Sequence, residues 1–340
     1  MANPYLFIVG CPRSGTTLLQ RMVNAHPQLA IIPESHWILR LFDERKGLTP
    51  EALVTPEVIS CLLEQVDFRR CRVDQSELET LLESDQPVSY ADFVTDIFDA
   101  YGRAQGKTIA GNKTPGFARR LSVLHALWPR ARFVHLIRDG RDVCLSVADW
   151  PKAQQKKPGI FCTWREDPVS TTAFWWELNV RLARQGGDLL GPELYHEVRY
   201  ESLIDNPAQE CGALCRFLAL PYDDRMLRFH EGRTRTKPGL DAKHAWLPIT
   251  CGLRDWASQI PAADVERFEA AAGGLLTELG YPRGVSHPRR EALEHASKIR
   301  DLLAQDPNWG LMAPGPEVER LELVLKARDS RPRPLAAAAG

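Results

Sequence analysis

The sequence has no long apolar run and almost no net charge. Its 340 residues carry 43 Lys and Arg against 44 Asp and Glu, a formal net charge of −1. A balanced charge gives no general attraction for nucleic acid or for an anionic membrane surface. No apolar stretch reaches the roughly 20 residues of a membrane-spanning helix, and the first residues lack the basic and apolar regions of a signal peptide. We therefore expect no nucleic-acid partner, no membrane and a cytoplasmic location.

The sequence also lacks closely spaced cysteine pairs. Its eight cysteines are scattered, and none forms a Cys-x-x-Cys motif. Cys211 and Cys215 stand one helical turn apart, without further recognisable metal ligands. Scattered thiols of this kind are typical of buried apolar side chains in a reducing compartment. The sequence therefore predicts reduced thiols and no metal site.

A phosphate-binding loop is present near the beginning of the chain. The apolar run Leu6–Val9 is followed by GCPRSGTT, residues 10–17, and then by a helical pattern. In such a strand–loop–helix unit the first N–H groups of the helix have no partner within the helix and converge on an anion that the helix dipole also favours. Gly10 and Gly15 let the backbone come close to that anion. An ordinary strand-to-helix turn needs only a glycine, so the added Arg, Ser and Thr residues favour a binding loop.

This loop does not contain the lysine of a nucleotide-hydrolysing P-loop. The motif GxxxxGK[ST] has Lys where this chain has Thr16, and the positive charge stands instead at Arg13. Kinases and ATPases use that lysine on the β- and γ-phosphates and the next hydroxyl on Mg²⁺. The substitution indicates a donor with less charge and no metal. A kinase or a nucleotide-binding protein of the same fold is the alternative function.

A second candidate phosphate site lies further along the chain. Phe133–Ile137 has the pattern of a buried strand, and a helix follows Asp139. Arg138 stands at the carboxyl end of this strand and Ser146 two helical turns further on, so both can face the crevice in which open α/β sheets bind ligands. A guanidinium and a hydroxyl suit a second phosphate. The alternative is a local ion pair of Arg138 with Asp139 or Asp142.

Together, the segments GCPRSGTT and LIRDGRDVCLS resemble the nucleotide signatures of the sulfotransferase family, which uses 3′-phosphoadenosine-5′-phosphosulfate (PAPS) as donor. Within it, the chain most resembles the tyrosylprotein sulfotransferases and their bacterial relatives, over roughly residues 4–282. The resemblance implies a P-loop NTPase-like three-layer α/β sandwich with a central parallel sheet. It also implies that Arg138 and Ser146 hold the 3′-phosphate and that adenosine 3′,5′-bisphosphate is the product. The residues implied for the 5′-phosphosulfate are Arg13, Ser14, Gly15, Thr16 and Thr17.

Three further segments carry the resemblance: HPQLAIIPES from residue 26, GNKTPGF from 111 and VRYESLIDNP from 198. By position they imply Glu34 as the base, Lys113 at the sulfuryl group and Tyr200 beside the adenine. Sulfuryl transfer is treated as an in-line displacement that depends on positioning and electrostatic stabilisation, which Arg13 and Lys113 would supply. The acceptor hydroxyl must lose a proton, and a carboxylate can take it. His36 is a rival base, and Glu34 could instead cap a helix that begins near Ser35.

One position departs from the family pattern. Tyrosylprotein sulfotransferases have an arginine four residues beyond the serine of the 3′-phosphate site, where this chain has Trp150. Another cation would then come from the loop between His230 and Lys243, where the candidates are Arg233, Arg235, Lys237 and Lys243. The segment from Cys251 resembles the family's closing segment, in which Trp256 would pack a clamp over the nucleotide.

Strands that alternate with helical patterns predict a parallel sheet with helices on both faces. The expected strands are Tyr5–Val9, Ala30–Ile32, Thr108–Gly111, Phe133–Ile137 and Tyr195–Val198. We expect a sulfotransferase domain over 1–284 with a helical insertion at 48–103. A helical appendage at 285–328 and a disordered tail at 329–340 would follow.

The acceptor is not identified by these motifs. A tyrosine peptide, a sugar hydroxyl and a small phenol or alcohol all need the same base and the same donor site. An acidic peptide would favour a basic surface, which the lysines between 152 and 157 permit without requiring it. We expect a hydroxyl-bearing small molecule or saccharide rather than a tyrosine peptide, and we make no prediction of the oligomeric state.

Overall fold

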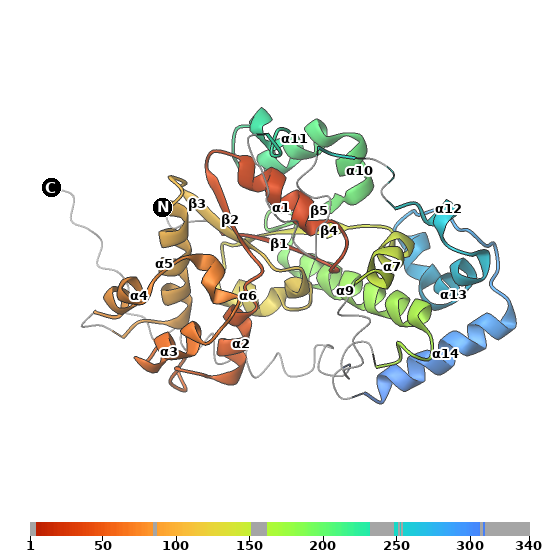
Figure 1. Ribbon diagram of the computed structural model, residues 1–340, viewed down its shortest axis with the longest axis horizontal. Helices are drawn as coiled ribbons and strands as arrows, with labels where there is room; N and C mark the ends of the chain where they lie inside the picture. Colours follow the sequence, from red (N-terminus) through yellow and green to blue (C-terminus); the bar gives the residue numbers. More distant parts are fainter. Residues whose placement is uncertain are drawn as a thin grey trace.

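The computed structural model describes residues 5–83, 87–150, 162–231, 248–250, 252, 254–306 and 309. Within them, a five-stranded parallel sheet has the strand order β2-β3-β1-β4-β5 (Figure 1). The strands are β1 (Leu6–Gly10), β2 (Leu29–Pro33), β3 (Ile109–Lys113), β4 (Arg132–Ile137) and β5 (Tyr195–Arg199). Every expected strand is present, with ends that differ from the prediction by at most two residues.

Helices cover both faces of the sheet. On one face lie α1 (Thr16–Ala25), α10 (Tyr200–Asp205) and α11 (Pro207–Phe217), followed by the short η3 (Asp224–Met226). On the other lie α5 (Tyr90–Arg103), α6 (Leu121–Leu127) and α9 (Pro168–Leu190). The alternation of β1 explains both layers, because Leu6 and Ile8 pack under α1 while Phe7 and Val9 pack under α5. The expected three-layer sandwich is confirmed.

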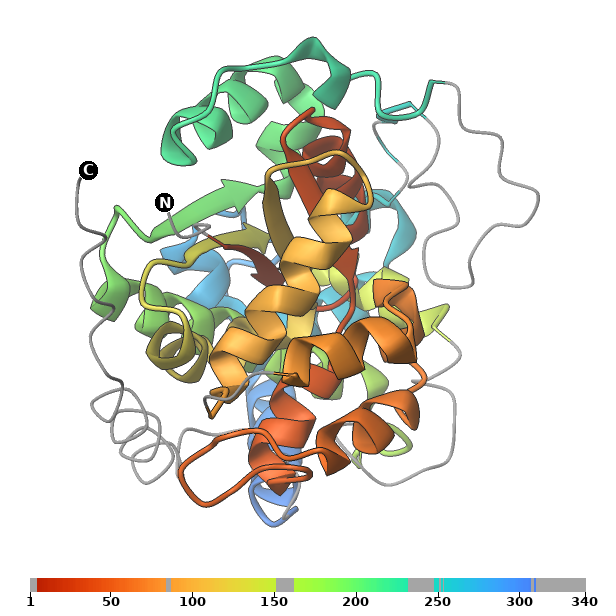
Figure 2. The same ribbon diagram turned by 90° about the vertical axis from the view of Figure 1, so that its left-hand side faces the viewer.

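The region of the expected insertion is helical. It contains α3 (Glu57–Leu63), η1 (Phe68–Cys71), α4 (Gln75–Leu82) and α5, and it follows α2 (Trp37–Glu44). Figure 2 shows these helices together on the side of the sheet that carries α5. Two short elements lead from the strands into the helical layers, η2 (Pro115–Arg119) after β3 and α7 (Gly140–Ala148) after β4. No helix of the described chain combines the length and the apolar character needed to cross a bilayer.

The C-terminal helices pack against α7 and α9. They are α12 (Trp256–Gln259), α13 (Ala262–Glu278) and α14 (Arg290–Ala304). The hydrophobic cluster between them contains Trp176 of α9, Phe268 of α13 and Ile299 of α14. The helix α14 lies in the expected appendage, while the second helix expected there and the expected tail lie outside the described residues. The domain division at residue 284 stays a prediction.

Candidate active site

The loop of residues 10–17 makes a tight connection from β1 into α1. Gly15 is the N-cap of α1 and has a φ of 97°, and Arg13 also has a positive φ of 77°. A Cβ atom on Gly15 would lie 2.5 Å from the ring of Tyr200, and one on Gly10 would lie 2.5 Å from the carbonyl oxygen of Leu136. Both glycines therefore allow other parts of the protein to approach the loop, in addition to the anion that we expected.

Ser14 is a fully buried residue of this loop. Its hydroxyl has no hydrogen-bond partner among the described residues. A buried polar group without a partner costs about 1–3 kcal/mol. An anionic group bound in this loop would give the hydroxyl a partner, together with the N–H groups that the first turn of a helix leaves without partners inside the helix.

Arg13 joins the first motif to the second. Its Nε atom donates to Oγ of Ser146 in α7 at 3.1 Å. The same guanidinium lies 5.7 Å from the ring centroid of Trp150. Trp150, the residue that departs from the family pattern, therefore lies within the range of a cation–π interaction with Arg13. Two motifs that are distant in the sequence lie side by side here.

Arg138 is connected to the same loop through Tyr200. Its guanidinium is 4.2 Å from the ring centroid of Tyr200, the ring that also packs on Gly15. Its Nη2 atom donates to Oδ2 of Asp142 at 3.2 Å. The local ion pair considered from the sequence is therefore present, with Asp142 and not with Asp139, whose carboxylate binds Arg141. The buried Nε of Arg138 has no partner in the described chain, so the guanidinium retains donor capacity for a phosphate.

Glu34 and Lys113 meet at the carboxyl ends of neighbouring strands. Pro33 of β2 is in register with Lys113 of β3, and the backbone N–H of Glu34 donates to the carbonyl of Lys113 at 2.7 Å. The Lys113 ammonium lies 2.9 Å from Oε1 of Glu34 and 3.3 Å from Oγ1 of Thr17. The side chain of Lys113 is 3% exposed and that of Glu34 29%. The buried ammonium of Lys113 therefore contacts both the carboxylate of Glu34 and the loop of residues 10–17.

The electrostatic surroundings keep Glu34 ionised. Burial raises the pKa of this carboxyl, but the charge and hydrogen bond of Lys113 outweigh it, so the pKa lies below its usual range. His36 lies 3.9 Å from Glu34 and is half exposed, so it remains near enough to be a rival base. The alternative role for Glu34 as a helix cap has no support, because α2 begins at Trp37 with His36 as N-cap and the carboxylate binds Lys113.

Two groups that hold Arg138 in place were not predicted from the sequence. Nε1 of Trp176 donates to the carbonyl of Arg138 at 3.0 Å, and a carboxylate oxygen of Glu201 accepts from the N–H of Asp139 at 2.9 Å. Trp176 was visible as one of two adjacent tryptophans, and both are buried. The four basic candidates between His230 and Lys243 and the lysines between 152 and 157 lie outside the described residues.

Comparison with known proteins identifies the family. The model of the Sulfotransferase family matches residues 4–224. Protein-tyrosine sulfotransferase 1 of Danio rerio is 26% identical over 301 residues, which cover 84% of this chain and 74% of that protein. Protein-tyrosine sulfotransferase 1 of Homo sapiens is 24% identical over 340 residues, 94% of this chain and 81% of that one. The solved sulfotransferase domain from the curacin biosynthetic pathway has a TM-score of 0.50 at 20% identity, over 88% of this chain and 98% of that chain, and supports the fold.

These relatives contradict our expectation about the acceptor. Their names give protein tyrosine as the group that they sulfate, whereas we expected a small molecule or a saccharide. The motifs for donor and base are the same for every hydroxyl acceptor, so they offered no physical ground for that preference. The family model covers more than half of the chain, and this protein therefore belongs to the Sulfotransferase family, a family of enzymes that transfer sulfuryl groups.

Proposed function

We propose that this protein transfers the sulfuryl group of PAPS to the phenolic hydroxyl of a tyrosine in a protein or peptide. One observation carries the proposal: the buried ammonium of Lys113 lies between the carboxylate of Glu34 and the hydroxyl of Thr17. A base and a cation therefore stand together at the loop that would hold the sulfuryl donor. The tyrosine acceptor is supported by the names of the relatives.

The donor would lie across the phosphate loop and the start of α7. Residues 13–17 would hold its 5′-phosphosulfate, and Arg138 and Ser146 its 3′-phosphate, with Tyr200 beside the adenine. Two observations support this fit, because the hydroxyl of Ser14 and the Nε of Arg138 are buried donors without partners in the described chain. PAPS supplies an activated sulfuryl group with a phosphate as its leaving group. The scheme gives no role to a metal ion.

In the transfer step, Glu34 would accept the proton of the tyrosine hydroxyl while the tyrosine oxygen forms its bond to sulfur. The bond between sulfur and the 5′-phosphate oxygen breaks, and adenosine 3′,5′-bisphosphate leaves with the bonding electron pair. Lys113 and Arg13 would stabilise the negative charge on the peripheral and leaving oxygens. Because Lys113 can then bind the sulfuryl oxygens, its hold on Glu34 would weaken, which makes the carboxylate a stronger base at the moment of transfer.

The direct test is sulfation of a tyrosine peptide by the purified protein. We expect label from sulfur-35 PAPS to appear in the tyrosine peptide and not in the matched phenylalanine peptide. Labelling of a free phenol or a sugar without labelling of the peptide would contradict the proposed acceptor. A thermal-shift comparison tests the donor: we expect stabilisation by adenosine 3′,5′-bisphosphate without metal, whereas stabilisation by ATP with Mg²⁺ alone would favour a kinase.

A further inference from the structure

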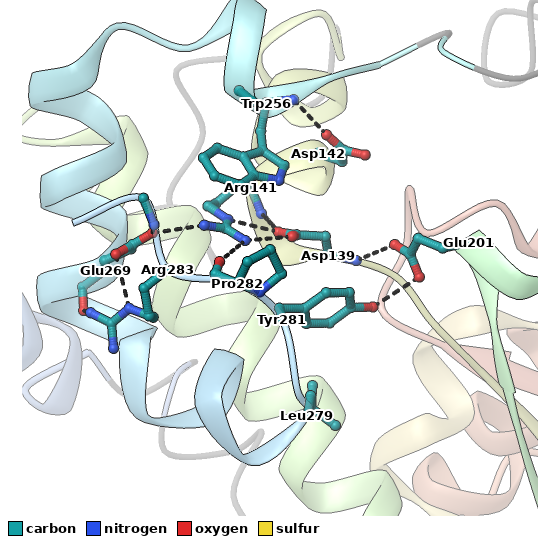
Figure 3. Close-up of polar contacts among 12 residues, drawn as sticks. Asp139, Arg141, Asp142, Glu201, Trp256, Glu269, Leu279, Tyr281, Pro282 and Arg283 are labelled. Atoms are coloured by element: carbon teal, nitrogen blue, oxygen red, sulfur yellow. Dashed lines mark hydrogen bonds and ion pairs between the residues drawn. The ribbon is translucent and has the colours of Figure 1, made fainter. Parts of the chain in front are cut away.

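The turn that carries Arg138 is fixed by a buried charge network centred on Arg141 (Figure 3). Arg141 is fully buried. The carboxylate of Asp139 accepts from its backbone N–H at 2.9 Å, from Nε at 3.0 Å and from Nη2 at 2.7 Å. The remaining terminal nitrogen, Nη1, donates to Oε1 of Glu269 in α13 at 2.7 Å. Arg141 therefore connects the residue next to Arg138 with the C-terminal part of the chain.

Glu269 is itself held on the C-terminal side. Its side chain is fully buried and accepts from Nε of Arg283 at 2.9 Å and from the backbone N–H of Gly284 at 2.7 Å. The chain that follows α13 also reaches Arg141 directly, since the carbonyl of Pro282 accepts from Nη2 at 2.8 Å. Figure 3 shows Glu269 and Arg283 on one side of Arg141 and Asp139 on the other.

Trp256 adds a second connection between the C-terminal segment and the turn. Its ring centroid lies 3.5 Å from the guanidinium carbon of Arg141. Its backbone N–H donates to Oδ1 of Asp142 at 2.9 Å, while Oδ2 of the same carboxylate binds Arg138. We expected Trp256 to pack a clamp over the nucleotide, and in the structure its contacts are with the turn that carries the phosphate-binding arginine.

The backbone around Arg138 is therefore held from several elements at once. Trp176 of α9 binds the carbonyl of Arg138, and Glu201 of α10 binds the N–H of Asp139. The Asp139 side chain is held through Arg141 by α13. Removal of one partner from a buried charge network leaves a buried charge uncompensated and shifts its neighbours. Removal of the Glu269 charge would thus be transmitted through Arg141 and Asp139 to the position of Arg138.

We propose that Glu269 is a positioning residue for the 3′-phosphate of the donor. Through Arg141 and Asp139 it fixes the turn from which Arg138 reaches that phosphate, and so it contributes to the preference for a 3′-phosphorylated nucleotide. This inference rests on the proposed function, in which Arg138 binds the 3′-phosphate. The side chain of Glu269 binds Arg141, Arg283 and the backbone N–H groups of Gly284 and Val285, so its role would be to position other groups.

The helix α13 offers a matched control for this role. Glu266 lies one turn before Glu269, binds Arg289 at 2.6 Å and accepts from its backbone N–H, much as Glu269 binds Arg283 and Gly284. The hydrogen bonds described for Glu266 are all with Arg289, and none of them reaches the turn at 138–142. A general loss of stability in α13 should therefore appear in both variants, and a loss of 3′-phosphate recognition in only one.

The test compares two ligands, adenosine 3′,5′-bisphosphate and adenosine 5′-monophosphate, by titration calorimetry. We expect Glu269→Gln to weaken binding of the bisphosphate about three- to tenfold and to leave binding of the monophosphate unchanged. The KM for PAPS should rise by a similar factor with little change in kcat. Glu266→Gln should bind both ligands as the unsubstituted protein does. Equal weakening of both ligands by Glu269→Gln, no weakening, or the same pattern in Glu266→Gln would overturn the proposal.

Two further variants keep the outcome decisive. Trp256→Leu removes a half-buried ring that contacts Arg141. It should also weaken binding of the bisphosphate and leave binding of the monophosphate unchanged. This variant therefore decides the question if Glu269→Gln does not fold. Arg138→Ala tests the function on which the inference rests. If Arg138→Ala abolishes the preference for the bisphosphate and Glu269→Gln does not, only the positioning role fails. If the unsubstituted protein shows no such preference, the proposed donor site fails.

Discussion

Replacement of Glu34 by glutamine removes one charge and one proton acceptor and little else. The amide oxygen can still accept from Lys113, which lies 2.9 Å from the carboxylate, so the connection to Thr17 is retained. General-base catalysis typically contributes about a hundred- to ten-thousand-fold. We therefore expect kcat to fall by that factor, which corresponds to about 3 to 5 kcal/mol in the barrier.

The affinity of Glu34→Gln for the nucleotide should not fall together with kcat. In the free protein the carboxylate of Glu34 neutralises the buried ammonium of Lys113. Without this partner the ammonium is a buried charge that lacks its counter-ion, and an anionic donor can supply one. We expect the affinity for PAPS to be unchanged or tighter in Glu34→Gln, so the loss of kcat cannot be attributed to weaker binding.

The assay measures initial rates at saturating PAPS and tyrosine peptide, with PAPS affinity from competition against adenosine 3′,5′-bisphosphate. His36→Gln is the control, since His36 lies 3.9 Å from Glu34 and is the rival base. It should retain kcat within a few fold. Activity of Glu34→Gln within about tenfold of the unsubstituted protein, together with a large loss in His36→Gln, would refute the assignment of the base.

Lys113→Met should lower kcat about a hundredfold or more and change the affinity for adenosine 3′,5′-bisphosphate little; a strong loss of that affinity would make Lys113 a nucleotide anchor instead. Gly15→Ala should weaken nucleotide binding and lower the thermal midpoint, because φ is 97° and the new methyl would lie 2.5 Å from the ring of Tyr200; wild-type values for both would contradict the close packing seen there. His135 is fully buried, and burial lowers its pKa to about 3, so the folded protein keeps it neutral while the unfolded chain binds a proton below about pH 6.5. The contribution of His135 to the free energy of unfolding is therefore fully present above about pH 6.5 and is lost as the pH falls toward 3. Between pH 7 and pH 5 the free energy of unfolding should fall by about 2 kcal/mol more than in His135→Gln, and equal losses in urea unfolding would refute this.

The strands could be predicted from the sequence, and the two candidate phosphate motifs could be recognised in it, because their signals are local. β1 and β2 are short apolar runs that end at a glycine and a proline, and β4 is mostly apolar and is followed by Arg138, so these signals need no knowledge of the rest of the chain. The meeting of Glu34 with Lys113 also follows from topology. Both residues stand at carboxyl ends of strands, and in a parallel sheet these ends share one edge, where ligands bind.

The connections that fix Arg138 could not be predicted in this way. Arg141 and Glu269 are 128 residues apart, and their contact depends on how α13 packs against α7 and α9. No local pattern distinguishes Glu269, which binds Arg141, from Glu266, which binds Arg289. The preference for a small-molecule acceptor failed because the motifs concern donor and base alone. The cytoplasmic location stays a prediction, which fractionation of the host cell would test.

Backbone strain links the fold to the chemistry at the end of β2. Glu34 is a non-glycine residue with a positive φ of 30°, a conformation that costs about 1–3 kcal/mol. Two bonds to β3 and the residue after it fix the conformation, since the N–H of Glu34 donates to the carbonyl of Lys113 and the N–H of Ser35 donates to Oγ1 of Thr114 at 2.8 Å. The same strand that fixes this turn ends in the lysine that binds the Glu34 carboxylate. The position of Glu34, the proposed base, relative to Lys113 therefore depends on the pairing of β2 with β3, and not on the loop that carries Glu34.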